Sequence, residues 1–243
     1  MKVKTIITIL YLLFELSLSN SFAATTIINP SIDNTMAEDF SNNSSGDCDS
    51  IFSGTTDNNV ARRALMQFDI ATAIPPGSTI NRVTLTMNVT RGSNHPDAVM
   101  TIHPVTLAWA EAATGVTPNG CGTRGGGQGE PAVTGAATWL SAMHNQTLWG
   151  SPGGDFGVAA SGSTIVNNIT PVWDSAAAGN GAMVSDVQSW LDSPAANYGW
   201  ILIGDEASPT TSRRFDSTEG SAAPALVVDF TPTGDVEACC QTD

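Results

Sequence analysis

The residues most suited to chemistry lie in a polar loop at positions 42–50. This loop reads Asn-Asn-Ser-Ser-Gly-Asp-Cys-Asp-Ser, so Asp47 and Asp49 stand among amide, hydroxyl and carbonyl oxygens. Calcium is held in proteins by such hard oxygen ligands, and Asp33 and Asp39 could join the set. We therefore expect either a structural calcium site that includes Asp33, Asp47 and Asp49, or a loop closed by hydrogen-bonded Asx turns. The spacing excludes an EF-hand, because the terminal glutamate is missing.

The tryptophans offer a second kind of chemistry, because an exposed indole is a flat apolar platform on which a sugar ring can stack. Trp149 and Trp173 lie in polar surroundings and are the best candidates for such platforms. Trp109 is intermediate between a binding residue and a packed loop anchor. Trp190 and Trp200 lie in apolar patterns that are typical of a core.

Four of the seven arginines form two adjacent pairs, Arg62 with Arg63 and Arg213 with Arg214. Planar guanidinium groups form bidentate hydrogen bonds with carboxylates, which leaves two interpretations open. In one, Arg63 and Arg214 make structural ion pairs across neighbouring strands. The candidate partners are Asp69, Asp216 and Glu219. In the other, exposed arginines such as Arg62 and Arg213 grip the carboxylate of an acidic sugar.

The charge balance narrows the choice of partners. The full chain carries a formal net charge of −14, with 9 Lys and Arg against 23 Asp and Glu. Both lysines lie in the first four residues. This balance disfavours nucleic acid and anionic membrane surfaces as partners, because binding to them depends largely on Lys and Arg. An anionic polysaccharide would need a local arginine patch or a bridging calcium ion, whereas a neutral glycan would not.

The N-terminal residues 1–23 are typical of a secretory signal peptide. Lys2 and Lys4 precede an apolar run at 6–14, and Ser21 and Ala23 supply the small residues of a cleavage site. The run is too short to cross a bilayer, and Glu15 interrupts it. We expect cleavage after Ala23, release to the extracellular space or cell surface, and no membrane insertion of the mature chain.

Cysteine usage agrees with an oxidising compartment. Cys48 and Cys121 each lie in a polar, glycine-rich loop, and a disulfide between them is the preferred pairing. Cys239 and Cys240 are adjacent, which is unfavourable for bridging each other. A zinc site is the alternative, although there is no CxxC pair and the histidines are far from the cysteines in sequence.

Short strands must position these groups, since period-two alternation and β-branched residues mark most ordered segments. Strands are expected at 25–28, 50–53, 63–69, 79–90, 99–105, 164–169, 200–203, 213–217 and 225–231. Residues 183–191 instead show helical spacing that stops before Pro194. Residues 112–137 are rich in glycine and predict a long surface loop. The expected fold is all-β, a jelly-roll β-sandwich with one short amphipathic helix.

Several motifs follow one another in an order that is typical of one family. They are residues 63–69 (Arg-Ala-Leu-Met-Gln-Phe-Asp) with 74–80, Trp109-Ala110-Glu111 with Thr138-Trp139, Val187-Gln188-Ser189-Trp190, residues 197–200, and residues 213–219 with 224–226. Together they resemble the DNRLRE domain of bacterial secreted proteins over residues 27–230. The resemblance implies a jelly-roll sandwich without intrinsic catalysis, similar to a group of alginate-binding carbohydrate-binding modules.

The expected organisation is a signal peptide at 1–23, a DNRLRE-like β-sandwich domain at 24–231 and a cysteine-containing tail at 232–243. The tail resembles the opening of cysteine-rich repeats that follow this domain in some relatives, so the chain could be a truncated fragment.

Catalysis is not expected from the sequence. No GxSxG nucleophile elbow accompanies the three histidines, no pair of acids lies in a context that raises a pKa, and the mature chain has no lysine to serve a lyase.

The expected function is a secreted, non-catalytic carbohydrate-binding module for an extracellular or cell-wall polysaccharide. The alternative is a structural or adhesive cell-surface domain without a sugar pocket. The possible cofactor is structural Ca²⁺, and the sequence leaves the oligomeric state open.

Overall fold

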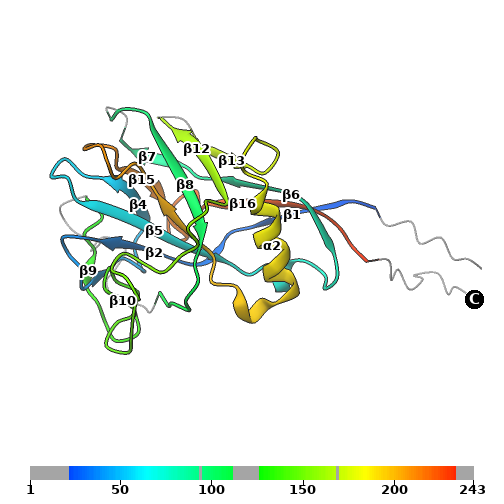
Figure 1. The fold of residues 1–243 in the computed structure, drawn as a ribbon, viewed down its shortest axis with the longest axis horizontal. Coiled ribbons are helices and arrows are strands. Elements are labelled where there is room, and N and C mark those ends of the chain that lie inside the picture. The colour runs from blue at the N-terminus through cyan, green and yellow to red at the C-terminus, as the bar shows by residue number, and fades with distance from the viewer. Residues whose placement is uncertain (1–21, 93–94, 112–125, 168–169, 234–243) are drawn as a thin grey trace, which may run out of the picture.

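The computed structural model describes residues 22–92, 95–111, 126–167 and 170–233. Figure 1 shows them as antiparallel sheets packed against one another, with one prominent helix. The four-stranded sheet has the order β1 (Ala24–Ile28), β16 (Ala225–Thr231), β6 (Thr79–Thr86) and β13 (Val172–Asp174). The predicted all-β sandwich with one short amphipathic helix is confirmed.

The larger sheet has eight strands. Its order is β12 (Gly162–Val166), β8 (Ala98–Pro104), β14 (Trp200–Ile203), β5 (Ala61–Phe68), β4 (Ser50–Thr55), β15 (Arg213–Asp216) and β7 (Val89–Arg91), and β2 (Pro30–Ala37) pairs with β5 off this path. Two small ribbons join β3 (Asn43–Ser44) to β9 (Glu130–Pro131) and β10 (Ser141–Met143) to β11 (Thr147–Leu148).

The main core lies between the two sheets. Leu85 and Val228 project into it from the small sheet, and Met66, Ile102 and Phe215 project into it from the large one. These side chains alternate with residues that point away, which is the period-two pattern of a sheet with one face in the core. Burial of this apolar surface is the main favourable contribution to folding.

A second core covers the opposite face of the large sheet. It is built from Met36 of β2, Leu65 of β5 and Ile201 of β14, on which Trp109 and Trp149 pack. The chain between β8 and β12, which carries β9, β10 and β11, supplies much of this layer (Figure 1). Strand β5 is therefore buried on both faces, which explains the uninterrupted apolar run Ala64-Leu65-Met66 at its centre.

Helix α2 (Ala182–Asp192) is the predicted amphipathic helix. Met183, Val187, Trp190 and Leu191 are buried in the main core. The Gln188 side chain accepts a hydrogen bond from the backbone N–H of Ile80 at 2.9 Å and donates one to the Ser78 carbonyl at 3.1 Å. These bonds hold the helix against the start of β6. A 3₁₀ turn, η1 (Pro194–Ala196), follows where proline ends the α-helix. The other helix is the single turn α1 (Ile70–Ala73).

Strand β2 is missing from the predicted strands, because its polar residues do not alternate with apolar ones. Asp33, Asn34 and Thr35 are all buried. Asn34 donates to the Ala137 carbonyl at 2.7 Å, and Thr35 accepts from the Phe52 backbone N–H at 3.0 Å. Hydrogen bonds of this kind offset the cost of burying polar side chains. Because their partners lie far away in the sequence, the local residue pattern does not predict them.

The predicted strand at 79–90 is divided in two. β6 ends at Thr86 in the small sheet, and β7 begins at Val89 in the large one. Asn88, in the step between them, donates to Asp216 at 2.7 Å. This connection carries the chain from one layer of the sandwich to the other.

Within the described ranges, no helix is long and apolar enough to cross a membrane. The predicted signal peptide falls largely on residues 1–21, and the cysteine-containing tail falls largely on 234–243, both outside the described residues.

Candidate functional site

The tryptophans proposed as sugar platforms are buried. Trp149 is 5% exposed, and its indole N–H donates to the Thr138 carbonyl at 2.8 Å. Trp173 is fully buried in the main core and donates to the Met100 carbonyl at 3.0 Å. The prediction that these two rings are exposed is wrong, because a layer of loops covers the first and the second sheet covers the other.

Trp109 is also buried, at 5% exposure, and donates to the Tyr198 carbonyl at 2.9 Å. It is a packed anchor of the second core and not an exposed binding residue. The core positions predicted for Trp190 and Trp200 are confirmed, with their ring centroids 4.8 Å apart.

The two arginines proposed to grip a sugar carboxylate are buried. Arg213 is fully buried and donates to backbone carbonyls of the 95–96, 166–167 and 211–212 segments. Burial lowers the pKa of its guanidinium below the ordinary value. Arg62, 1% exposed, forms an ion pair with Asp39 at 2.7 Å and donates to the Gly126 carbonyl at 2.8 Å. The prediction that both side chains are exposed is wrong.

Arg63 makes a structural ion pair, but with a partner that was not predicted. Its guanidinium donates to both carboxylate oxygens of Glu206, at 2.7 Å each. It also donates to the Gly153 carbonyl at 2.8 Å and lies 5.0 Å from the centre of the Trp139 ring. The bidentate geometry is that expected of a strong arginine–carboxylate pair.

The carboxylates predicted to pair with Arg63 and Arg214 have other roles. Asp69 caps α1 by accepting from the Thr72 backbone N–H at 3.2 Å. Asp216 accepts from Asn88. Glu219 belongs to a group of carboxylates described below.

One cleft of about 260 Å³ opens on the large sheet. Arg91 of β7 lies opposite Arg214 of β15, and Arg214 lies opposite Phe52 of β4. Cross-strand partners point to the same face of a sheet. Their neighbours Ile51 and Phe215 enter the main core, so this row faces away from it.

Polar groups line the rest of this cleft. Besides Phe52, Arg91 and Arg214, the lining comprises Asp39, Thr56, Asp57, Asn58, Arg62, Gly92, His95, Gly126, Gln128 and Ser212. Arg62 contributes to the cleft as a buried group already paired with Asp39. Arg214 donates through Nε to Thr90 at 2.7 Å, which fixes the plane of its guanidinium. Hydroxyl-rich ligands suit such a lining, because it offers donors and acceptors in several directions.

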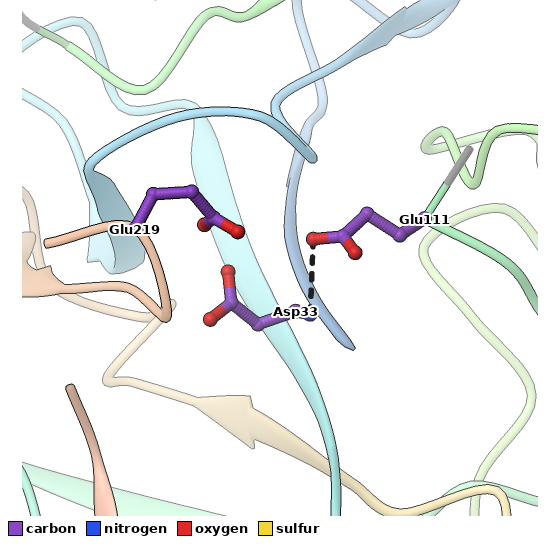
Figure 2. A group of neighbouring side chains, drawn as sticks. All are labelled: Asp33, Glu111 and Glu219. Atoms are coloured by element: carbon purple, nitrogen blue, oxygen red, sulfur yellow. Dashed lines mark hydrogen bonds between the residues drawn. The ribbon is translucent and has the colours of Figure 1, made fainter. Parts of the chain in front are cut away.

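A second group of polar side chains, all of them carboxylates, lies at another part of the large sheet. One carboxylate oxygen from each of Asp33, Glu111 and Glu219 lies within 4.8 Å of the other two. Figure 2 shows the three carboxylates turned toward one another. Asp33 comes from β2, Glu111 from the chain after β8, and Glu219 from the turn after β15.

Local hydrogen bonds position this carboxylate group. Oδ2 of Asp33 accepts from both the backbone N–H and the hydroxyl of Thr218, at 2.7 and 2.6 Å. The Asp33 backbone N–H donates to Glu111 Oε1 at 3.3 Å, the dashed line of Figure 2. Gly46 packs directly against Glu111, and a Cβ at this glycine would come 2.5 Å from Glu111 Cγ.

The electrostatics of the carboxylate group are unfavourable for the ionised forms. Burial raises the pKa of Asp33 to about 7, although the bonds from Thr218 act in the opposite direction. Burial likewise raises the pKa of Glu111 to about 8, with further contributions from the negative charges of Asp33, Glu219 and Asp47. Desolvation and like charge both disfavour a carboxylate.

The residue pattern predicted Asp33 as a calcium ligand, but with Asp47 and Asp49 as the other ligands. Asp47 is half-buried near Glu111, and Asp49 is exposed and accepts from Ser50 at 2.9 Å. The group that the structure brings together contains neither. Glu111 and Glu219 were missed as members because they come from distant segments, and no local spacing signals their approach.

The predicted disulfide joins Cys48 to Cys121, and only Cys48 lies among the described residues. Cys48 is buried at 4% exposure, and Cys121 lies outside the described residues. The pairing stays a prediction.

The fold and these two sites define an all-β sandwich with a polar surface cleft and a separate group of carboxylates. No protein-family model matches the chain, and no curated protein matches it. The resemblance to the DNRLRE domain therefore stays a prediction from the sequence motifs.

Proposed function

We propose that this protein is a secreted, non-catalytic carbohydrate-binding module whose glycan lies in the cleft on the large sheet. The observation that carries the proposal is the cross-strand row of Arg91, Arg214 and Phe52, which lines a polar cleft of about 260 Å³. This volume lies just below the range of about 300–1,000 Å³ that is typical of small-molecule sites.

The row of arginines favours an acidic sugar. Arg91 and Arg214 lie directly opposite each other on neighbouring strands, so both side chains point to the face on which a carboxylate would bind. Arginine also recognises carboxylates through two parallel hydrogen bonds. A uronate polysaccharide therefore fits the cleft better than a neutral one, despite the negative charge of the chain as a whole.

The test is a glycan array probed with residues 24–243, followed by titration of the strongest glycan. We expect binding to uronate-containing glycans, and a loss of at least tenfold in affinity for Arg214→Ala. Arg82→Ala is the matched control, because it removes the same charge from the other sheet, where Arg82 pairs with Asp174. A silent array, or equal affinity of Arg214→Ala and the unmodified protein, would exclude this function for the cleft.

A structural or adhesive role is the second candidate, and one observation favours it. β12 is an edge strand of the large sheet, and its Ile165 lies opposite Val99 of β8. These side chains are 62% and 53% exposed. An exposed apolar pair on the outermost strand of a sheet suits association between chains.

Light scattering after size-exclusion chromatography tests this second role. If copies join through this edge, the protein forms oligomers that Ile165→Lys converts to monomers. Val158→Lys is the control, because Val158 is 96% exposed and lies outside the strands. A monomer at all concentrations would contradict assembly through β12.

A further inference from the structure

We propose that Asp33, Glu111 and Glu219 bind a calcium ion that ties β2 to the chain after β8 and to the turn after β15. This site is separate from the glycan cleft, since none of the three residues lines that cleft. It also differs from the site predicted from the sequence, with which it shares only Asp33.

The observation that points to a ligand is a buried oxygen of Asp33. The residue is fully buried, and its Oδ2 is satisfied by Thr218. Its Oδ1 has no hydrogen-bond partner among the described residues. A buried acceptor without a partner is costly, and an ion in the space that the three carboxylates share would complete it (Figure 2).

The separations fit one shared ion. Calcium binds oxygen at about 2.3–2.6 Å, so two oxygens on opposite sides of it lie at most about 5 Å apart. The three carboxylates each offer an oxygen within 4.8 Å of the others. They can therefore bind the same ion with little movement, and water or backbone carbonyls can fill the remaining positions.

Among the described residues, no arginine forms an ion pair with this group of carboxylates. Within the described residues, the ion pairs join Arg62 to Asp39, Arg63 to Glu206 and Arg82 to Asp174. Asp47 adds further negative charge near Glu111. A divalent cation would balance most of the charge of three ionised carboxylates, which none of the arginines in these three ion pairs does.

The type and access of the ligands favour calcium. All three offer oxygen, and none offers the nitrogen or sulfur that zinc and copper prefer. Two of the three are on loops, which suits the flexible coordination of calcium better than the strict octahedron of magnesium. Asp33 is buried, Glu111 is half-buried and Glu219 is exposed, so the ion can enter from solvent beside Glu219.

The experiment uses residues 24–243 freed of metal and titrated with CaCl₂ or MgCl₂. Equilibrium dialysis should find one calcium per chain. Thermal unfolding should shift upward by roughly 5–10 °C when calcium is a hundredfold above its Kd. Asp33→Asn should abolish both effects. Glu219→Gln should weaken binding at least tenfold, and because this position is exposed the variant keeps the fold.

Asp49→Asn is the matched control, since it removes a carboxylate from the neighbouring loop that the sequence had favoured. It should bind calcium like the unmodified protein. The proposal is overturned if no stoichiometric calcium binds, if Asp49→Asn loses binding while Glu219→Gln retains it, or if magnesium binds as tightly as calcium. None of these readouts involves a glycan, so failure of the glycan proposal would leave this one standing.

Discussion

Two sets of buried charges in this protein are built in opposite ways. Arg213 is fully buried, yet backbone carbonyls surround its guanidinium. Asp33 is just as deeply buried, yet one of its oxygens has no partner among the described residues, and two more carboxylates lie beside it. The described residues satisfy the buried cation, whereas one oxygen of the buried Asp33 has no partner among them. This difference is the reason for proposing an ion beside Asp33 and none beside Arg213.

The largest effect is expected from replacing Arg213, whose guanidinium is surrounded by backbone carbonyls. Arg213→Met keeps the apolar stem but leaves several buried carbonyls without donors, and each lost partner costs about 1–3 kcal/mol. We expect a loss of about 3–5 kcal/mol in the free energy of unfolding, measured by urea denaturation. Arg82→Ala, at an exposed position, should change stability by less than about 1 kcal/mol. Equal effects of the two substitutions would contradict the structural role.

Replacing Asp33, whose Oδ1 has no partner among the described residues, should change the stability of the protein in a direction that depends on calcium. In calcium-free buffer at pH 8, Asp33→Asn should be more stable than the unmodified protein by about 1–2 kcal/mol, because it removes a poorly solvated charge while keeping an acceptor for Thr218. In saturating calcium the order should reverse, since only the unmodified protein gains from the ion. Thermal unfolding of both proteins in both buffers measures this reversal. If the same protein is the more stable one with and without calcium, the comparison between Arg213 and Asp33 fails.

A smaller effect is expected from changing Gly46, which packs against Glu111 of the carboxylate group. Gly46→Ala places a methyl group 2.5 Å from Glu111 Cγ and 2.9 Å from its carbonyl oxygen, so the glutamate must move. We expect calcium affinity to fall about tenfold, which corresponds to about 1.4 kcal/mol. Gly181→Ala is a control, because nothing lies within 4 Å of its added Cβ. Unchanged affinity in Gly46→Ala would show that Glu111 is not held by this contact.

The smallest effect concerns a carboxylate outside this group, Asp186 of α2, whose hydrogen-bond donors are both neutral. It accepts from the hydroxyl of Ser161 and from the indole N–H of Trp200, the latter at 2.7 Å. Burial still raises its pKa above the ordinary value of 3.8. The folded protein therefore binds this proton more tightly than the unfolded chain, and the contribution to stability falls as pH rises from about 3.8 through the folded pKa.

Asp186→Asn removes that titration. The stability of the variant relative to the unmodified protein should increase between pH 3 and pH 7, as followed by urea denaturation at a series of pH values. Parallel pH profiles would mean that Asp186 titrates alike in the folded and unfolded states.

The sequence predicted the strands and the helix well because they depend on local periodicity. β14 and β16 have the predicted bounds, and α2 has its predicted apolar stripe. β2 was missed because hydrogen bonds to distant loops, rather than alternation, stabilise its buried polar residues.

The candidate sites were harder to predict because exposure depends on the layer above a residue. Trp149 stands beside glycine and serine in sequence, yet it is buried in a second core on the large sheet. Arg91 and Arg214 become neighbours only when β7 pairs with β15. Asp33 was predicted as a candidate cation ligand from its chemistry alone, but its neighbours Glu111 and Glu219 follow from the fold.

The pairing of the first and last strands bears on how this domain would respond to tension. β1 runs antiparallel to β16, with Ala24 opposite Phe230, so the chain enters and leaves the sandwich at the same end. β1 is also the outer strand of its sheet. A force applied through the two chain ends would open this ladder one residue pair at a time instead of shearing all its hydrogen bonds together. The domain is therefore mechanically weak along its own chain, which suits a module that presents a binding surface better than a tension-bearing link in a fibre.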